Sequence, residues 1–216
     1  MLSGIGPEAE LKAHGIRTLA DLPVGANLQD HLAVMIRWER NDPGPFRAQM
    51  RFDRMAVDMV RAWVKLRSAD PHDRVRIAVN AFDDPEDLAE LYEGYECARE
   101  VGYSSAMSAF RGRQLAPDPA LDSRAATEDW IRRTAITAHH PAGTCAMGSG
   151  PGSVVDPALR VRGVERLRVV DASVIPDMPS AHINAVVFVF VIAEKASDLI
   201  RSATPAEVAS EALSEA

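Results

Sequence analysis

The amino-acid composition of the chain changes after residue 137, and this change limits the folds that the sequence can adopt. Glycine, proline and histidine gather there, and two short β-type stretches follow, Leu159–Val161 and Leu167–Val170, hinged at Gly163. Turn-forming residues between such stretches predict strands. The second stretch ends in Asp171, which we expect at the carboxyl end of a buried strand, where open α/β sheets bind their ligands.

The rest of the chain adds helices and one more strand. Apolar residues spaced by three and four predict helices, alternation predicts strands, and proline, acidic residues and glycine mark helix ends. These signals predict a short helix at 6–15, a longer helix across 47–66, a strand at 74–79, a helix from Asp84 to a stop at Gly102, a helix after Thr127, and a helix over most of 186–200.

Composition excludes several classes of function. The 216 residues are 47% hydrophobic and carry 24 basic against 31 acidic side chains, spread without a block of like charge, so nucleic acid is not an expected partner. The longest apolar run, Ala185–Ala193, has nine residues, whereas a membrane-spanning helix needs about 20. The first residues lack a signal-peptide pattern, so we expect a cytoplasmic protein in which Cys97 and Cys145 are free thiols.

Two segments concentrate polar side chains that could perform chemistry, residues 138–148 and residues 171–185. Each places a histidine in a non-repetitive stretch, beside small residues that let a ligand approach closely. A histidine in such a loop is more often exposed or simply hydrogen-bonded than functional. Composition alone therefore leaves the role of both segments open.

Metal and hydrolase sites fit the sequence poorly. A hydrolase would need a nucleophile elbow of the GxSxG type, and none occurs. A zinc site is disfavoured because the chain has neither a CxxC nor an HExxH motif. Its ligands would have to come from His139, His140, His182 and Cys145.

A dinucleotide fingerprint also fails. Residues 4–9 fit the pattern GxGxxA, but only three residues stand before them, so no strand precedes the glycines. Pro7 also lacks an amide N–H that a pyrophosphate could use. We therefore expect no FAD-phosphate loop within these 216 residues.

Six motifs stand in the order found in one known family. They are LSGIGP at 2–7, LPVGANLQDH at 22–31, DDPEDL at 83–88, HPAGTCAMG at 140–148, VVDPALRVRGVERLRVVDASVIP at 154–176 and NAVVFVFVIAEKASDLI at 184–200. These motifs resemble the glucose-methanol-choline (GMC) oxidoreductases over nearly the whole chain. The resemblance implies an FAD-dependent oxidoreductase acting on the CH–OH group of an alcohol.

The resemblance also implies a catalytic pair of histidines. His140, in HPAGT, matches the first member, and His182, in SAHINA, matches the second. An imidazole, with an intrinsic pKa of about 6.5, can take the alcohol proton near neutral pH. A second imidazole can hold the developing alkoxide by a hydrogen bond. We therefore expect His140 to be the base and His182 to orient the alkoxide, while His139 points elsewhere.

Five residues match cofactor neighbours in the family. Asp171 and Ala172 match positions near the FAD pyrophosphate, and Asn184 and Ala185 match neighbours of the flavin ring. Asn27, in NLQDH, resembles part of a loop packed beside the cofactor. The resemblance implies no metal.

The expected fold is α/β, with an incomplete FAD-binding Rossmann-like part and a reduced substrate domain of antiparallel sheet and helices. Residues 1–34 and 155–202 would form the FAD-domain side, residues 35–154 the substrate domain, and residues 203–216 a flexible tail. Family members are more than twice as long and carry a GxGxxG loop near the amino end. We therefore expect a truncated or split enzyme that needs a partner chain with the FAD-binding half; the alternative is a non-catalytic remnant or interaction module.

Overall fold

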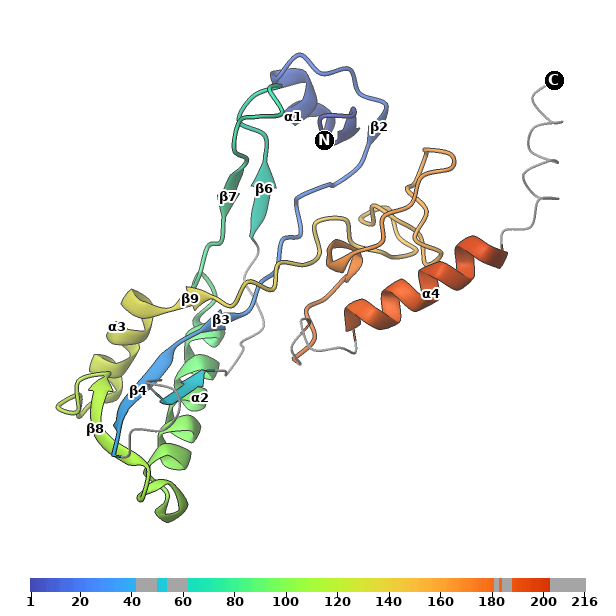
Figure 1. The fold of residues 1–216 in the computed structure, drawn as a ribbon. Helices are drawn as coiled ribbons and strands as arrows, with labels where there is room; N and C mark the ends of the chain where they lie inside the picture. Colours follow the sequence, from blue (N-terminus) through green and yellow to red (C-terminus); the bar gives the residue numbers. More distant parts are fainter. Residues whose placement is uncertain (42–49, 54–61, 181–182, 184–187, 203–216) are drawn as a thin grey trace, which may run out of the picture.

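The computed structural model describes residues 1–41, 50–53, 62–180, 183 and 188–202 (Figure 1). Its regular elements, in chain order, are β1 (Ile5–Gly6), α1 (Glu8–Ala13), β2 (Ala20–Asp21), β3 (Leu32–Ala33), β4 (Met35–Arg40), β5 (Met50–Asp53), β6 (Trp63–Lys65), β7 (Arg76–Ala78), α2 (Pro85–Tyr103), η1 (Ser105–Met107), β8 (Arg111–Ala116), α3 (Arg124–Thr134), β9 (Ile136–Thr137), η2 (Ala172–Val174) and α4 (Phe188–Ser202).

An antiparallel sheet of three strands, in the order β5-β4-β8, forms one end of the molecule. Alternate residues of a strand point to opposite faces of its sheet. From Leu32 to Trp38 the even-numbered residues are buried on one face, whereas Arg40 at the end of β4 is exposed. That face packs against α2 and α3, and its core consists of Leu32, Val34, Ile36, Trp38, Leu88, Leu91, Tyr95 and Ile131.

Helix α2 confirms the prediction of a helix beginning after Asp84. The Asp84 carboxylate accepts a hydrogen bond from the Glu86 N–H at 2.9 Å, and Pro85 occupies the first turn, where its missing N–H costs nothing. The predicted stop at Gly102 is wrong, because the helix continues to Tyr103. Gly102 lies against the Trp38 ring, where an added Cβ would come within 2.4 Å of a ring carbon.

The predicted helix across 47–66 is also wrong within the described residues. Met50–Asp53 form β5 and Trp63–Lys65 form β6, while residues 54–61 lie outside the described part. Both segments pair with a neighbouring strand, β5 with β4 and β6 with β7. Backbone pairing therefore overrides a helical spacing of apolar residues, which is a weak signal in short runs. The predicted strand at 74–79 is present as β7.

Two further predicted helices are present, α1 near the amino terminus and α3 in the middle of the chain. Helix α1 has acidic residues in its first turn, and Gly15 follows it with a φ of +69°. Helix α3 begins at Arg124, before the predicted Thr127, because the Ser123 hydroxyl accepts a hydrogen bond from the Ala126 N–H.

Short strand pairings between segments far apart in sequence bring the residues of the candidate site together. Strand β3 pairs antiparallel with β9, so Leu32 lies opposite Thr137. The Ala138 N–H then donates to the His31 carbonyl oxygen at 2.8 Å. Isolated bridges continue the contact from Gln29 to Ala142. Residues 27–31 and 137–143 therefore run side by side although more than 100 residues separate them.

The last third folds around a second core, made of Val154, Val155, Leu159, Val161, Val174 and Ala196. The expected strands at 159–161 and 167–170 meet only through the isolated bridge between Arg160 and Arg168. The expectation that the second is buried is wrong, because Leu167 is 40% exposed and Val170 is 39% exposed. The predicted carboxy-terminal helix is present as α4, which buries Ala196 in this core.

The described residues thus combine helices with several small sheets, consistent with an α/β class. Parallel pairing among them is limited to β1 with β2 and the bridge from Met147 to Val155. No described helix is both long and apolar enough to cross a membrane. Both cysteines are free thiols in this structure.

Candidate functional site

Two buried histidines from distant parts of the chain meet beside the β3–β9 pairing. His31 is fully buried and His140 is 3% exposed. Their Nδ1 atoms are 3.1 Å apart, and the two rings stand nearly perpendicular, at 86°, with centroids separated by 5.3 Å. The contact is therefore a ring-to-ring hydrogen bond between side chains 109 positions apart.

A third atom fixes the direction of this hydrogen bond. His31 Nε2 lies 3.0 Å from the carbonyl oxygen of Pro179, and a carbonyl can only accept, so Nε2 carries the hydrogen. A neutral His31 then has an unprotonated Nδ1, which accepts from Nδ1–H of His140. A neutral His140 is consequently the Nδ1–H tautomer, and its Nε2 carries a basic lone pair.

Asp30 fixes the backbone that carries His140. One oxygen of its carboxylate accepts from the His140 N–H at 2.9 Å, and the other accepts from the Thr137 hydroxyl. His139 has a positive φ of 61°, which turns the chain so that its own side chain is exposed while that of His140 is buried. The exposed His139 is thus separated from buried His140, and that it points away from the site stays a prediction.

The loop after His140 is held against η2 by backbone hydrogen bonds. Cys145 N–H donates to the Ser173 carbonyl oxygen at 2.8 Å, and Met147 N–H donates to that of Val174, also at 2.8 Å. Gly143 has a φ of +81°, and an added Cβ would lie 2.3 Å from the Asn27 carbonyl oxygen. Only glycine fits there without displacing backbone.

Asn27 connects the same loop to the segment after η2. Its side-chain N–H donates to the Pro176 carbonyl oxygen at 2.9 Å, and its side-chain oxygen accepts from Gln29 at 3.5 Å. Gln29 in turn accepts from the Met178 N–H. Asn27 and Gln29 thus hold the chain just before Pro179, whose carbonyl oxygen orients His31.

Asp171 and Ala172 lie at the start of η2, beside the loop that follows His140. The exposed Asp171 carboxylate accepts from the Ser173 N–H at 2.8 Å and has capacity for further donors such as hydroxyl groups. The Ala172 N–H has no acceptor among the described residues, so it can donate to an anionic oxygen. These donors and acceptors fit the sugar and phosphate parts of a cofactor such as FAD.

Three predicted site residues lie outside the described part of the chain: His182, Asn184 and Ala185. Conversely, sequence reasoning did not select His31 or Asp30, although both stand in the NLQDH motif. The available signal was a His following an acid in a segment dense in turn formers. It was too weak to show that this segment lies beside residue 140.

Other chemistry finds little support in this part of the molecule. Across residues 1–41, 50–53, 62–180, 183 and 188–202, no group of three or more His, Cys, Asp or Glu side chains could hold a metal ion. Burial raises the pKa of Cys145, although a hydrogen bond with Ser173 opposes the shift. Cys145 is therefore a poor nucleophile near neutral pH.

Comparison with known proteins gives one consistent family. The profile of the GMC oxidoreductase carboxy-terminal domain matches residues 60–190. Choline oxidase of Arthrobacter globiformis is 34% identical over 96% of this chain and 47% of its own length. Human mitochondrial choline dehydrogenase is 32% identical over 93% of this chain and 45% of its own length.

Solved structures agree with the sequence matches. Pyridoxine 4-oxidase from Mesorbium loti has a TM-score of 0.80 and 27% identity, over 93% of this chain and 48% of that protein. The chain thus spans about half the length of the relatives it matches. The alignment with choline oxidase extends over 257 residues, more than the 216 of this chain, so that relative also has residues with no counterpart here.

Proposed function

Because the chain belongs to the GMC oxidoreductase family, we propose that it carries the alcohol-binding histidines of an FAD-dependent oxidoreductase acting on CH–OH groups. The observation that supports this most directly is the hydrogen bond between His31 and His140. It connects two imidazoles in a buried place and fixes the tautomer of a neutral His140 with the hydrogen on Nδ1. Small-molecule alcohols are the proposed substrates, because choline oxidase and an alcohol dehydrogenase of Pseudomonas putida are among the relatives.

His140 acts as the base in this proposal. Oxidation of an alcohol carbon requires the hydroxyl group to lose its proton, and Nε2 of neutral His140 has the lone pair to accept it. His31 is a positioning residue: its Nδ1 accepts from His140 Nδ1–H and so keeps the reactive lone pair on Nε2. The positive charge that develops on His140 is stabilised by the same hydrogen bond.

His182 holds the alkoxide oxygen as a hydrogen-bond donor in this proposal. FAD, when bound, supplies the acceptor for the hydride that leaves the alcohol carbon. The residues that would hold it are Asn27, Asp171, Ala172, Asn184 and Ala185.

The proposal assigns residues 1–34 and 155–202 to a Rossmann-like FAD-domain side and residues 35–154 to the substrate side. The nucleotide-binding half with its GxGxxG loop would then come from the remainder of the protein or from a partner chain. The half-length coverage of the relatives supports the second part of this proposal, a nucleotide-binding half outside these 216 residues.

The test is to assemble this chain with the amino-terminal half of Arthrobacter globiformis choline oxidase and add FAD. Anaerobic addition of an alcohol should then bleach the visible flavin absorption. The same preparation carrying His140→Ala is the control for a reaction that needs the base. An assembled flavoprotein that no alcohol reduces would contradict the proposed function.

A further inference from the structure

Asp30 is a buried carboxylate beside the two histidines, with only 8% of the residue exposed. One of its oxygens accepts from the His140 N–H at 2.9 Å, and the other accepts from the Thr137 hydroxyl. The Thr137 oxygen in turn accepts from the His139 N–H at 3.0 Å, so its own hydrogen is available to the carboxylate. Both oxygens of Asp30 therefore serve as acceptors, as in an ionised carboxylate.

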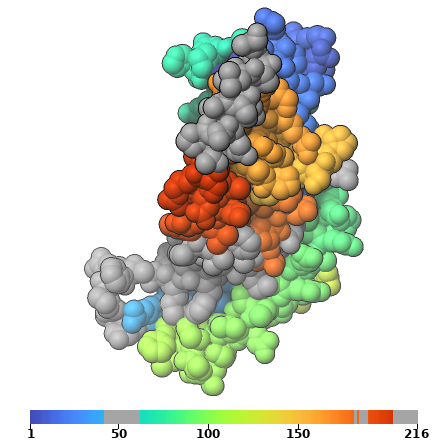
Figure 2. All heavy atoms as spheres, turned by 90° about the vertical axis from the view of Figure 1, so that its right-hand side faces the viewer, coloured from blue at the N-terminus to red at the C-terminus, as the bar shows by residue number. Residues whose placement is uncertain are grey.

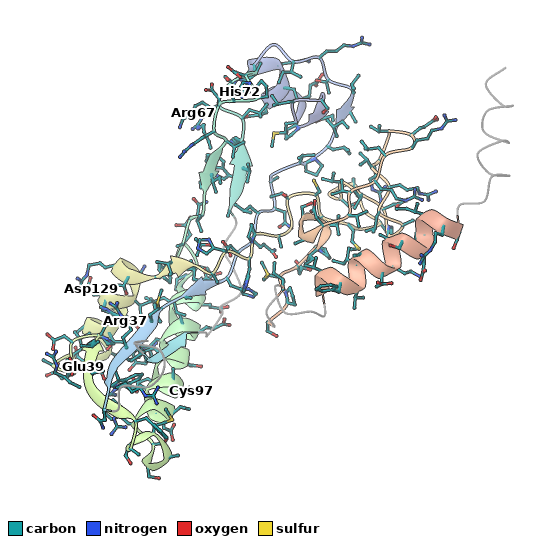
Figure 3. The ribbon with its side chains drawn as sticks, in the orientation of Figure 1. Arg37, Glu39, Arg67, His72, Cys97 and Asp129 are labelled. Atoms are coloured by element: carbon teal, nitrogen blue, oxygen red, sulfur yellow. The ribbon has the colours of Figure 1, made fainter. Side chains whose placement is uncertain are left out.

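The charge of Asp30 has no lysine or arginine as a counter-ion among the residues that the structure describes. Two exposed carboxylates labelled in Figure 3 show the contrast: Glu39 pairs with Arg113 at 2.7 Å, and Asp129 pairs with Arg133 at 2.6 Å. Exposed charges need little compensation, whereas a buried charge is costly unless it is hydrogen-bonded or paired. A positive charge that forms next to Asp30 would therefore be strongly favoured.

His140 is the neighbour of Asp30 that becomes positive in the proposed function, when it takes the alcohol proton. The carboxylate binds the backbone N–H of His140, so it lies within roughly 7 Å of the imidazole of the same residue. Opposite charges this close attract strongly in a buried place. The other titratable groups of residues 27–31 and 137–143 are His31 and the exposed His139, while the third segment contacts the pair through the uncharged Pro179 carbonyl.

We propose that Asp30 is a positioning residue whose negative charge stabilises the imidazolium form of His140 and so makes it a stronger base. This inference rests on the proposed function and adds a residue that acts through the base. The carboxylate is already fixed by its two hydrogen bonds, so no rearrangement is needed when the positive charge develops. Position and charge can be separated, because asparagine could still accept from the His140 N–H and donate to the Thr137 oxygen while carrying no charge.

The test is a pH titration of the ¹⁵N-labelled histidines in the chain alone, without flavin. His31 and His140 titrate as a coupled pair, so the midpoint of the first protonation seen at His140 is compared between variants. Asp30→Asn should lower this midpoint by about one pH unit, because loss of the anion destabilises the imidazolium.

Two control variants separate the charge from other effects. Thr137→Val removes a hydrogen bond to Asp30 but no charge, and should move the His140 midpoint by less than about 0.3 pH unit. Asp156→Asn makes the same charge change at a carboxylate that pairs with Arg160 at 2.9 Å, and should also leave the midpoint in place. At a pH above the midpoint, a retained Nδ1–H tautomer of His140 would show that the pair is intact in each variant.

A measurement on the unmodified chain makes the test independent of how well a variant folds. The ¹³Cγ signal of Asp30 should be that of an ionised carboxylate throughout the titration of His140. A protonated carboxyl group in that range, a midpoint that Asp30→Asn leaves unchanged, or an equal shift caused by Thr137→Val would each overturn the proposal. The titration needs neither flavin nor turnover, so its result is separate from that of the proposed function.

Discussion

At the scale of single residues, the two buried imidazoles determine each other's protonation. A free imidazole can place its hydrogen on either nitrogen, but the Pro179 carbonyl oxygen selects Nε2–H for His31. His31 then selects Nδ1–H for His140. The Pro179 carbonyl oxygen contacts His31, and His31 contacts His140. This oxygen thus determines that a neutral His140 has its basic lone pair on Nε2.

This relay of hydrogen bonds, from Pro179 through His31 to His140, predicts that His31 affects the His140 tautomer even in the chain without any cofactor. In ¹⁵N NMR at a pH where both rings are neutral, His140 should be mainly the Nδ1–H tautomer. His31→Phe removes the acceptor, so the His140 nitrogens should shift toward a mixture of tautomers. His139, exposed and next in sequence, is the internal reference and should not change. A His140 spectrum unaffected by His31→Phe would exclude the relay.

Kinetics of the assembled flavoprotein separate the roles of the two proposed catalytic histidines. His140→Ala should lower the rate of flavin reduction by about a hundredfold or more, as expected for loss of a positioned base. His182→Asn should cost much less, because an amide can still donate to the alkoxide, whereas His182→Ala should cost nearly as much as His140→Ala. Stopped-flow reduction measures all three. Equal rates for His140→Ala and the unmodified protein would remove His140 as the base.

At the scale of elements, the site depends on the contact between the loop after His140 and the loop around Asn27. Gly143→Ala would place a methyl group 2.3 Å from the Asn27 carbonyl oxygen, and its φ of +81° is unfavourable for alanine. We expect a loss of about 1–3 kcal/mol in the free energy of unfolding, measured with denaturant. Gly152→Ala, where a Cβ meets nothing within 4 Å, is the control and should change it by less than about 0.5 kcal/mol.

Local signals predicted elements better than periodicity did. The sequence Asp84–Pro85 is a chemical start signal, and α2 begins there because the capping hydrogen bond needs only neighbouring residues. The spacing of Phe52 and Trp63 suggested a helix, but whether such residues form strands depends on pairing partners outside that segment, β4 for β5 and β7 for β6. The sequence predicts Gly102 as a helix stop, but its contact with Trp38 depends on a residue outside its neighbourhood.

Only the part of the candidate site that has a local sequence signal was predictable. His140 stands in a distinctive run of small residues, and the family resemblance selected it. His31 also stands within a motif but was not predicted as a site residue, because nothing in its neighbourhood shows the pairing of β3 with β9 that brings it to His140. A site assembled from residues 109 positions apart is a property of the folded chain.

At the scale of the whole molecule, the 216-residue chain should bind FAD poorly by itself. Its expected cofactor contacts lie in loops, and no sequence within it combines a strand, a glycine-rich turn and a helix start that could hold the phosphates. The purified chain should therefore be colourless, as judged by its absorption spectrum. A yellow preparation with one FAD per chain would contradict this expectation.

The same chain should also self-associate, because α4 exposes large apolar side chains. One side buries Ala196 in the second core, yet Phe190 is 63% exposed, Val191 59% and Ile200 53%, and Figure 2 shows α4 at the surface. A surface helix usually presents polar residues to water, and exposed apolar patches promote association. Sedimentation velocity should show species larger than the monomer, increasing with protein concentration.

The same change, phenylalanine to glutamate, at two positions separates the contribution of α4 to association from that of the rest of the surface. Phe190→Glu places a charge on the exposed side of α4 and should shift the sedimentation profile toward monomer. Phe110→Glu makes the same change at a residue 46% exposed just before β8, and should leave association as it was. Equal effects of both changes would mean that hydrophobicity in general, rather than α4, drives association. A compact monomer at every concentration, with a cooperative melt, would show that α4 needs no partner.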